Sequence, residues 1–99
     1  MNILLISTSS VTSTLIHRIL TEDNIITVSD DNDIPSTIDL ILIDDYLMSD
    51  NFINNPKPGI VITQDIDDEM VHKLSGHNKT YVIKPFNSEQ LKRKINQII

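Results

Sequence analysis

The sequence predicts an α/β domain built on a parallel sheet, and two observations lead to that prediction. Residues 40–43 are four consecutive aliphatic residues, which is typical of a strand buried on both faces. Other short aliphatic runs alternate with segments whose apolar residues recur at helical spacing, as in βαβ units. The central run leads directly into Asp44 and Asp45. We therefore expect two carboxylates at the carboxyl end of a strand, the edge at which open parallel sheets bind ligands.

The composition indicates one globular domain that spans residues 1–99, with 39% hydrophobic and 22% charged residues. The absence of cysteine excludes a disulfide, a thiolate metal site and a cysteine nucleophile, and it agrees with a cytoplasmic location. A net charge of −6 disfavours direct contact with nucleic acid. The basic run 92–94 is expected to be a solvated helix face. No stretch has the length of a membrane span, so we expect no membrane contact either.

The first part of the chain predicts two strands around one helix, followed by an irregular segment. Residues 2–6 form the first strand, and residues from about 10 to 22 form a helix with an apolar stripe. Asn24 is expected to end this helix, because asparagine tolerates the left-handed conformation. Residues 25–28 form the second strand. Residues 29–37 are polar and contain a proline, so they predict a turn at most.

The part of the chain after the central strand predicts a short helical segment, a strand and a further helix. Residues 46–53 hold one or two helical turns, which the Asn- and Pro-rich run after them ends. Residues 60–63 form the fourth strand. Asp65 or Asp67 begins the next helix, because a carboxylate can accept hydrogen bonds from the first free N–H groups. Gly76 is a natural place for that helix to stop.

The last part predicts a strand followed by an amphipathic helix. Residues 80–83 form the fifth strand. The last helix begins at Asn87, and Gln90 lies three residues further on, as in a capping box. Leu91 and Ile95 begin the apolar stripe that faces the core.

The carboxyl ends of the predicted strands bring chemically different side chains to one edge of the sheet. Ser7 and Thr8 follow the first strand, Asp44 ends the third, Thr63 ends the fourth and Lys84 follows the fifth. A carboxylate, hydroxyls and an ammonium would meet there. This trio suits a phosphoryl group, because the carboxylate can accept the group while the hydroxyl and the lysine hold its oxygens.

These segments resemble the receiver domain of bacterial response regulators, and the resemblance extends over the whole chain. Residues 39–44 look like the phosphoacceptor strand of that family, and residues 81–86 contain its Lys-Pro-Phe sequence. The resemblance implies a flavodoxin-like (CheY-like), doubly wound, five-stranded parallel sheet of order 2-1-3-4-5, with a cis Lys-Pro bond. Residues 29–38 and 45–58 are short for crossovers, so we expect reduced second and third helices.

The resemblance also implies roles for four residues of this chain. Asp44 takes the place of the phosphoacceptor, and Thr63 and Lys84 take the places of residues that contact the phosphoryl group. Tyr81 takes the place of the switch aromatic. These positions together predict where a phosphorylation-dependent signal would be read.

One departure from the family pattern concerns the pair of acids that, with the acceptor, holds Mg²⁺. Ser7 and Thr8 stand in those positions here. Mg²⁺ prefers charged oxygen ligands, so Asp44 would remain almost alone, and Asp45 is expected to point to the other face of the sheet. We therefore expect no cofactor and at most weak Mg²⁺ binding at Asp44. Phosphorylation is expected to be slow or absent, because phosphoryl transfer relies on the metal.

The sequence thus predicts an atypical receiver, a pseudo-receiver, that is not an enzyme and acts through protein contacts. The expected partner is another protein, an output domain or a second copy of the chain. The resemblance places such contacts on the last helix, the fifth strand and the helix before it. The candidate contact residues there, besides Tyr81, are Met70, Lys73, Leu74, Gln90, Lys94 and Gln97.

Three alternatives remain open at the level of sequence. The chain could be a working phosphoacceptor receiver that uses Asp44 in a phosphorelay of a two-component system. It could be the receiver part of a longer regulator with a DNA-binding domain. The run from Asn2 to Leu15 also resembles enzyme IIB of the sugar phosphotransferase system, with Ser7 in place of the phosphorylated cysteine and without the glycine of its loop.

Overall fold

The computed structural model describes residues 1–99, and its centre is a parallel sheet of five strands in the order β2-β1-β3-β4-β5. The strands are β1 (Asn2–Ile6), β2 (Asn24–Val28), β3 (Leu40–Asp44), β4 (Gly59–Thr63) and β5 (Lys79–Ile83). Every residue of β3 and β4 is buried, as their uninterrupted apolar sequences predict. The predicted fold class and strand order are therefore confirmed.

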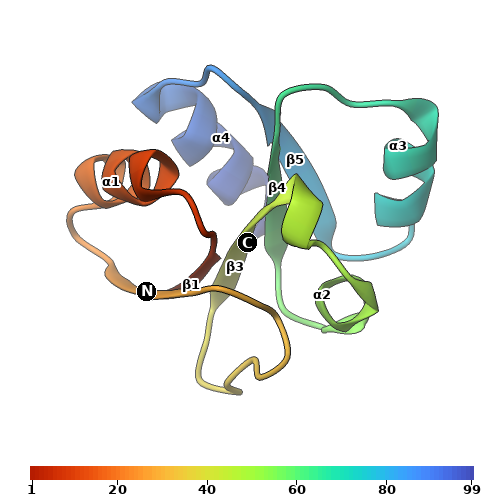
Figure 1. Cartoon of the computed structure of the whole chain (residues 1–99), viewed down its shortest axis with the longest axis horizontal. Coiled ribbons are helices and arrows are strands. Elements are labelled where there is room, and N and C mark those ends of the chain that lie inside the picture. The colour runs from red at the N-terminus through yellow and green to blue at the C-terminus, as the bar shows by residue number, and fades with distance from the viewer.

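Helices cover both faces of this sheet (Figure 1). α1 (Ser10–Ile19) and α4 (Ser88–Ile98) lie on one face, and α2 (Asp50–Asn54) and α3 (Asp68–Leu74) lie on the other. A 3₁₀ turn, η1 (Asp45–Leu47), connects β3 to α2. None of the helices combines the length and the hydropathy that crossing a bilayer requires.

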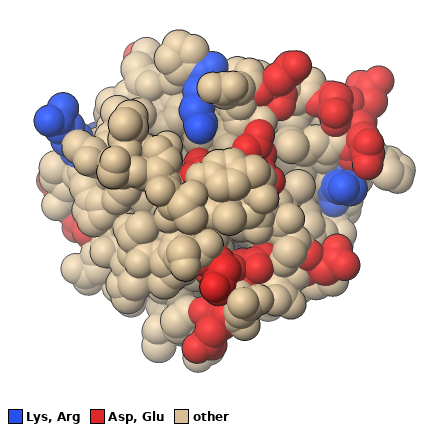
Figure 2. Space-filling view, in the orientation of Figure 1, with Lys and Arg blue, Asp and Glu red and all other residues tan.

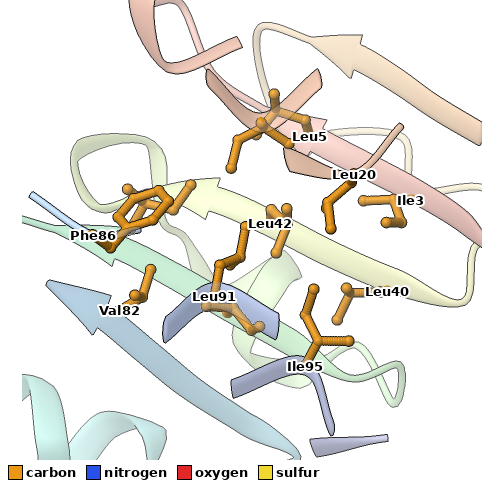
Figure 3. Packing of buried hydrophobic residues seen from close by; sticks show 12 residues of the cluster. Ile3, Leu5, Leu20, Leu40, Leu42, Val82, Phe86, Leu91 and Ile95 are labelled. Atoms are coloured by element: carbon orange, nitrogen blue, oxygen red, sulfur yellow. The ribbon is translucent and has the colours of Figure 1, made fainter. Parts of the chain in front are cut away.

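The sheet separates two hydrophobic clusters, and the larger one lies under α1 and α4. Figure 3 shows Leu91 and Ile95 of α4 beside Leu42 and Leu40 of β3 in this cluster. The smaller cluster contains Phe52 of α2 and Leu74 of α3, which pack against the opposite face of β1, β3 and β4. Because alternate residues of a strand point to opposite faces, the central strands supply side chains to both clusters.

The first helix is shorter than the sequence predicted. α1 ends at Ile19 rather than near residue 22, and the N–H of Leu20 donates to the carbonyl of Ile16. Asn24 does not end the helix in a left-handed conformation, since no residue other than glycine has a positive φ. Asn24 is instead the first residue of β2, where its N–H donates to the carbonyl of Met1 at 3.0 Å. Pairing with β1 therefore decides its conformation.

The connection between β2 and β3 contains no helix (orange to yellow in Figure 1), so the helix that the receiver resemblance implies at this place is absent. Ile34 and Ile38 of this connection pack into the smaller cluster and cover part of the face that a helix would cover. The buried Asp31 accepts a hydrogen bond from Ser49 Oγ at 2.5 Å, which ties the connection to the start of α2. Between β3 and β4, the helix that the resemblance implies is reduced to η1 and the five residues of α2, as expected.

The predicted helix starts in the second half are confirmed. Asp67, and not Asp65, begins α3, and its carboxylate accepts the N–H of Met70 at 2.8 Å. Asn87 and Gln90 form the predicted capping box of α4, with both hydrogen bonds at 2.8 Å. Gly76, two residues after α3, has φ of +79°, a conformation that favours glycine.

Candidate functional site

The carboxyl edge of the sheet brings together the polar residues that follow or end four of its strands. Asp44 and Thr63 are the last residues of β3 and β4. Ser7 follows β1, and its N–H donates to the carbonyl of Val28 at 2.9 Å. Lys84 follows β5, and its N–H donates to the carbonyl of Thr63 at 2.7 Å. The sheet ladder itself therefore positions these four side chains at one edge.

Asp44 is the centre of this edge, and its side chain is fully buried with 0% exposure. One carboxylate oxygen, Oδ2, accepts a hydrogen bond from Ser7 Oγ and a second one from the Tyr46 hydroxyl at 3.3 Å. The other oxygen, Oδ1, has no hydrogen-bond partner. Lys84 Nζ lies 3.9 Å from Oδ1, which is an ion pair without hydrogen-bond geometry. Two hydroxyls and one ammonium thus replace the water that this carboxylate has lost.

Tyr46 is a functional candidate that sequence reasoning missed, because it was treated only as part of a helical turn. Its hydroxyl lies 2.7 Å from Thr8 Oγ1 and 3.3 Å from Asp44 Oδ2. A carboxylate only accepts, so the phenol donates to Asp44 and the Thr8 hydroxyl donates to the phenol. The ring is exposed, whereas the carboxylate beneath its hydroxyl is not. Tyr46 and Thr8 together form a polar cover over Asp44.

Thr63 lies at the same edge, but its hydroxyl faces other partners than Asp44. Thr63 Oγ1 lies 2.8 Å from Asp45 Oδ2 and 2.6 Å from the carbonyl oxygen of Asp65. Asp45 begins η1 and pairs with Thr63, which alternates with Val61 of the smaller cluster, whereas Asp44 alternates with Leu42 of the larger cluster. Asp45 thus lies toward the other face of the sheet from Asp44, as expected. Asp45 and Thr63 therefore form a second polar pair beside Asp44.

Lys84 is held near Asp44 by the backbone on both sides. Its N–H pairs with β4, and the Lys84–Pro85 peptide bond is cis, as the resemblance implied. Ser7 and Lys84 are thus the predicted site residues that face Asp44 directly.

The residues present do not fit a Mg²⁺ ion of the kind that the receiver resemblance implies. No group of three or more histidine and acidic side chains comes together at this edge or elsewhere. Ser7 donates its hydroxyl proton to Asp44, and Thr8 lies in a hydrogen bond with Tyr46. Neutral hydroxyls in these two places cannot balance a divalent charge, which Mg²⁺ sites achieve with carboxylates.

The geometry also bears on the enzyme IIB alternative. That reading requires Ser7 in a loop that cradles a phosphate. Ser7 is buried, its Oγ donates to Asp44, and the same oxygen accepts the N–H of Ser9 at 3.1 Å. The hydroxyl is committed to these partners, so the geometry does not support a phosphate cradle there.

The predicted contact face consists of α4, β5 and α3, and β5 and α4 meet through one pair of side chains. Lys94 Nζ lies 4.8 Å from the centre of the Tyr81 ring, a cation–π arrangement that fixes both side chains. A shallow hollow beside this pair is lined by Tyr81, Val82, Ile83, Gln90, Arg93 and Lys94. Ile83 and Arg93 were not among the predicted contact residues, and Ile83 is 43% exposed although it is apolar.

Leu74 does not belong to this face as an exposed residue. Its side chain is 5% exposed and packs in the smaller cluster with Phe52. Met70, one helical turn earlier, is also partly buried against that cluster. The helical stripe that the sequence assigned to a partner is therefore the stripe that holds α3 on the sheet, while Lys73 remains exposed.

Lys79 is a second residue that sequence reasoning missed, and it lies at the amino end of β5, away from Asp44. Its side chain is buried, and Nζ donates to the carbonyls of Asn55 and Lys57 at 2.7 and 2.8 Å. It also lies 5.4 Å from the centre of the Phe52 ring. Desolvation by burial lowers the pKa of Lys79 from its ordinary value of 10.5. This lysine attaches the end of α2 to the sheet.

Comparisons with known proteins identify the fold. No protein-family model matches the sequence, and no curated protein matches it either. Among solved structures, the chemotaxis protein CheY4 of Vibrio cholerae superposes with a TM-score of 0.80 at 17% identity, over 99% of this chain and 98% of that one. A two-component response regulator from Clostridium difficile superposes with a TM-score of 0.77 at 22% identity, over 98% and 93%.

A third similar structure is the receiver domain of the sensor histidine kinase PA1611 from Pseudomonas aeruginosa, which carries a magnesium ion in its active-site cleft. It superposes with a TM-score of 0.73 at 22% identity, over 98% of this chain and 95% of that domain. The chain therefore has the CheY-like receiver fold over its whole length. At such low identity the likeness establishes the fold, and the site must be judged from the residues of this chain.

Proposed function

We propose that this protein is a signalling domain of the receiver type that acts through protein contacts and without phosphorylation of Asp44. The observation that carries the proposal is the burial and the hydrogen bonding of that carboxylate. It is fully buried, and Ser7 and Tyr46 occupy one of its oxygens. A phosphodonor would have to displace these hydroxyls without the metal that normally neutralises the transferring group.

The charge around Asp44 supports the same conclusion. Lys84 supplies one positive charge, and no second cation is paired with Asp44 or Asp45. A bound phosphoryl group would bring additional negative charge beside Asp45, which lies next to Asp44 in the chain. In this arrangement Lys84 serves to stabilise a permanently buried carboxylate, and no cofactor is needed for that task.

The contact surface that we assign to a protein partner is the face around Tyr81 and Lys94. It combines an exposed apolar residue, Ile83, with an aromatic ring, an arginine and a glutamine, a mixture that resembles the composition of protein interfaces. Its exposed or half-buried members from the predicted set are Met70, Lys73, Tyr81, Gln90, Lys94 and Gln97. The proposal therefore assigns binding, and no catalysis, to this domain.

A second candidate function, a working phosphoacceptor, is favoured by one observation only. Asp44 Oδ1 lacks a hydrogen-bond partner and faces Lys84. This is the oxygen that would attack a phosphodonor, with Lys84 placed to hold the incoming group.

The test that separates the two functions is an ¹⁵N–¹H correlation spectrum with and without Mg²⁺ and beryllofluoride, a mimic of the phosphoryl group. We expect no change at the amides of Asp44, Thr63 and Lys84 in the wild-type protein. The Asp44→Asn variant serves as the control, since it cannot bind the mimic. Shifts that converge on these three residues in the wild type, and are absent in the variant, would establish the phosphoacceptor instead.

A variant tests whether the cover over Asp44 is part of the cause. Tyr46→Ala removes the hydroxyl above Asp44 and leaves Ser7 in place. Because the two acids of a metal site are still missing, we expect this variant to remain unresponsive to Mg²⁺ and beryllofluoride. A response in Tyr46→Ala alone would mean that the cover, and not the lack of a metal site, prevents Asp44 from binding the mimic.

A further inference from the structure

The outer edge of β2 is an open end of the sheet. The register pairs Asn24 with Asn2 and Val28 with Ile6. The N–H of Asn24 donates to Met1, and the carbonyl of Val28 accepts from Ser7, the two residues that flank β1. In a parallel ladder alternate residues face the neighbouring strand, so the N–H and C=O groups of Ile25 and Thr27 point outward. No backbone hydrogen bond from a loop or turn reaches these two residues.

The loss of the second helix leaves an apolar side chain exposed on this strand. Ile26 is 56% exposed, although its register partner Leu4 is 1% exposed. Ile26 and Val28 share the face on which residues 29–39 take the place of a helix, and that connection covers only Val28 in part. An added strand at this edge would satisfy the outward backbone groups and bury Ile26 at the same time.

The charges around this edge are of one sign. Residues 19–56 contain nine Asp and Glu residues and no Lys or Arg. Exposed carboxylates stand at both ends of β2, with Glu22 before it and Asp30 and Asp33 after it. In Figure 2 the lower part of the face, where the β2–β3 connection runs, shows acidic side chains and no basic ones. This pattern attracts a cationic partner and repels an anionic one.

We propose that the edge of β2 binds an extended, basic peptide segment of a partner protein, which adds a sixth strand to the sheet. Main-chain hydrogen bonds to Ile25 and Thr27 supply affinity, and Ile26 accepts an apolar side chain of the peptide. The carboxylates at both ends of β2 select cations that flank the extended stretch. A second copy of this chain fits less well, because antiparallel pairing of two β2 strands places the Glu22 end against the Asp30 end.

The experiment uses the whole chain and the peptide KVTVTVK, acetylated and amidated, with EVTVTVE as the matched anionic control. In ¹⁵N–¹H correlation spectra we expect KVTVTVK to give saturable shifts at Ile25, Ile26 and Thr27, and EVTVTVE to give none. Ile26→Lys places a cation at the edge, which blocks strand addition, and should weaken binding by about tenfold or more, that is by about 1.4 kcal/mol.

Ile99→Lys provides the matched variant, because Ile99 is an exposed isoleucine outside β2 and outside the surface around Tyr81 and Lys94. It changes the net charge equally and should leave the affinity unchanged. Thr27→Pro removes only an outward N–H and serves as a second test of strand addition. The proposal would be overturned if both peptides bound equally or if binding did not saturate. It would also be overturned if the shifts centred on the acidic start of α3, or if both lysine variants weakened binding equally. Concentration-dependent shifts at β2 without peptide would replace it with self-pairing.

Discussion

At the scale of single residues, Lys79 is a buried cation without a carboxylate partner. Its ammonium is satisfied by two carbonyls at the end of α2 and by the face of Phe52. Gly59, which pairs with Lys79 in the sheet, has no space for a side chain, since a Cβ there would lie 2.6 Å from the Phe52 ring and 2.7 Å from the lysine stem. The lysine stem, the ring and the glycine thus form one tightly packed unit.

The lowered pKa of Lys79 predicts a pH dependence of stability. Between that pKa and 10.5 the folded protein has lost the proton while the unfolded chain still binds it. The free energy of unfolding therefore gains a contribution as pH rises through this window, of about 1.4 kcal/mol for each unit of pKa difference. In Lys79→Met this contribution is absent, so the difference in stability between wild type and variant should change in favour of wild type with rising pH.

Urea unfolding of both proteins at neutral pH and at several values up to 10.5 measures this difference. Lys92→Met, which removes an exposed amine from α4, is the control for the change of net charge. Parallel curves of stability against pH for wild type and Lys79→Met would contradict the prediction.

At the scale of elements, β5 and α4 make a face that is held together by its own contacts and still exposes binding groups. Leu91 and Ile95 attach α4 to the core, which leaves Gln90, Lys94 and Gln97 on another side of the helix. The capping box fixes where α4 begins, so the position of these residues relative to Tyr81 is determined locally. The apolar stripe of α3, in contrast, packs against the sheet and is not exposed to a partner.

Charge reversal tests the role of this face in self-association. Lys73→Glu combined with Lys94→Glu should lower the weight-average sedimentation coefficient at high protein concentration, because it places repelling charges on both sides of the contact. Arg18→Glu with Lys92→Glu changes the net charge equally at exposed positions outside the face and should have no such effect. Sedimentation that is unchanged in the first variant, or that changes equally in both, would count against the surface.

At the scale of the whole molecule, charge is distributed unevenly. The net charge is −6, and residues 19–56 carry nine of the fourteen acidic side chains without any Lys or Arg. The ion pairs Lys73–Glu69 and Arg93–Glu89 are exposed pairs within single helices, and such pairs contribute little to stability. Repulsion among carboxylates therefore outweighs attraction over a large part of the surface.

This imbalance predicts that salt stabilises the protein. Raising NaCl from about 0.01 M to about 0.15 M shortens the screening length from about 30 Å to about 8 Å. The midpoint of urea unfolding should move to higher urea concentration, because the repulsion that screening removes is stronger in the compact state. The Asp30→Asn, Asp33→Asn variant should show a smaller increase. A midpoint that falls with salt would mean that the ion pairs outweigh the repulsion.

The sequence by itself determined the features that depend on neighbours along the chain. Aliphatic runs of strand length gave the five strands, and helical spacing with Asp67, Asn87 and Gln90 gave the starts of α3 and α4. A parallel sheet then places every strand end on one edge, so the meeting of Asp44 and Lys84 could also be predicted. Period and capping are local properties, which is why they can be read without a structure.

Only the tertiary structure decided which partner each of these side chains has. Tyr46 reaches Thr8, Asp45 reaches Thr63, and Lys79 reaches the carbonyl of Asn55, in each case across segments distant in the chain. Such contacts depend on how loops and helix ends pack against the sheet, and no repeating pattern in the sequence records them. The burial of Leu74 and the open edge of β2 follow for the same reason, since each depends on whether another element covers that surface.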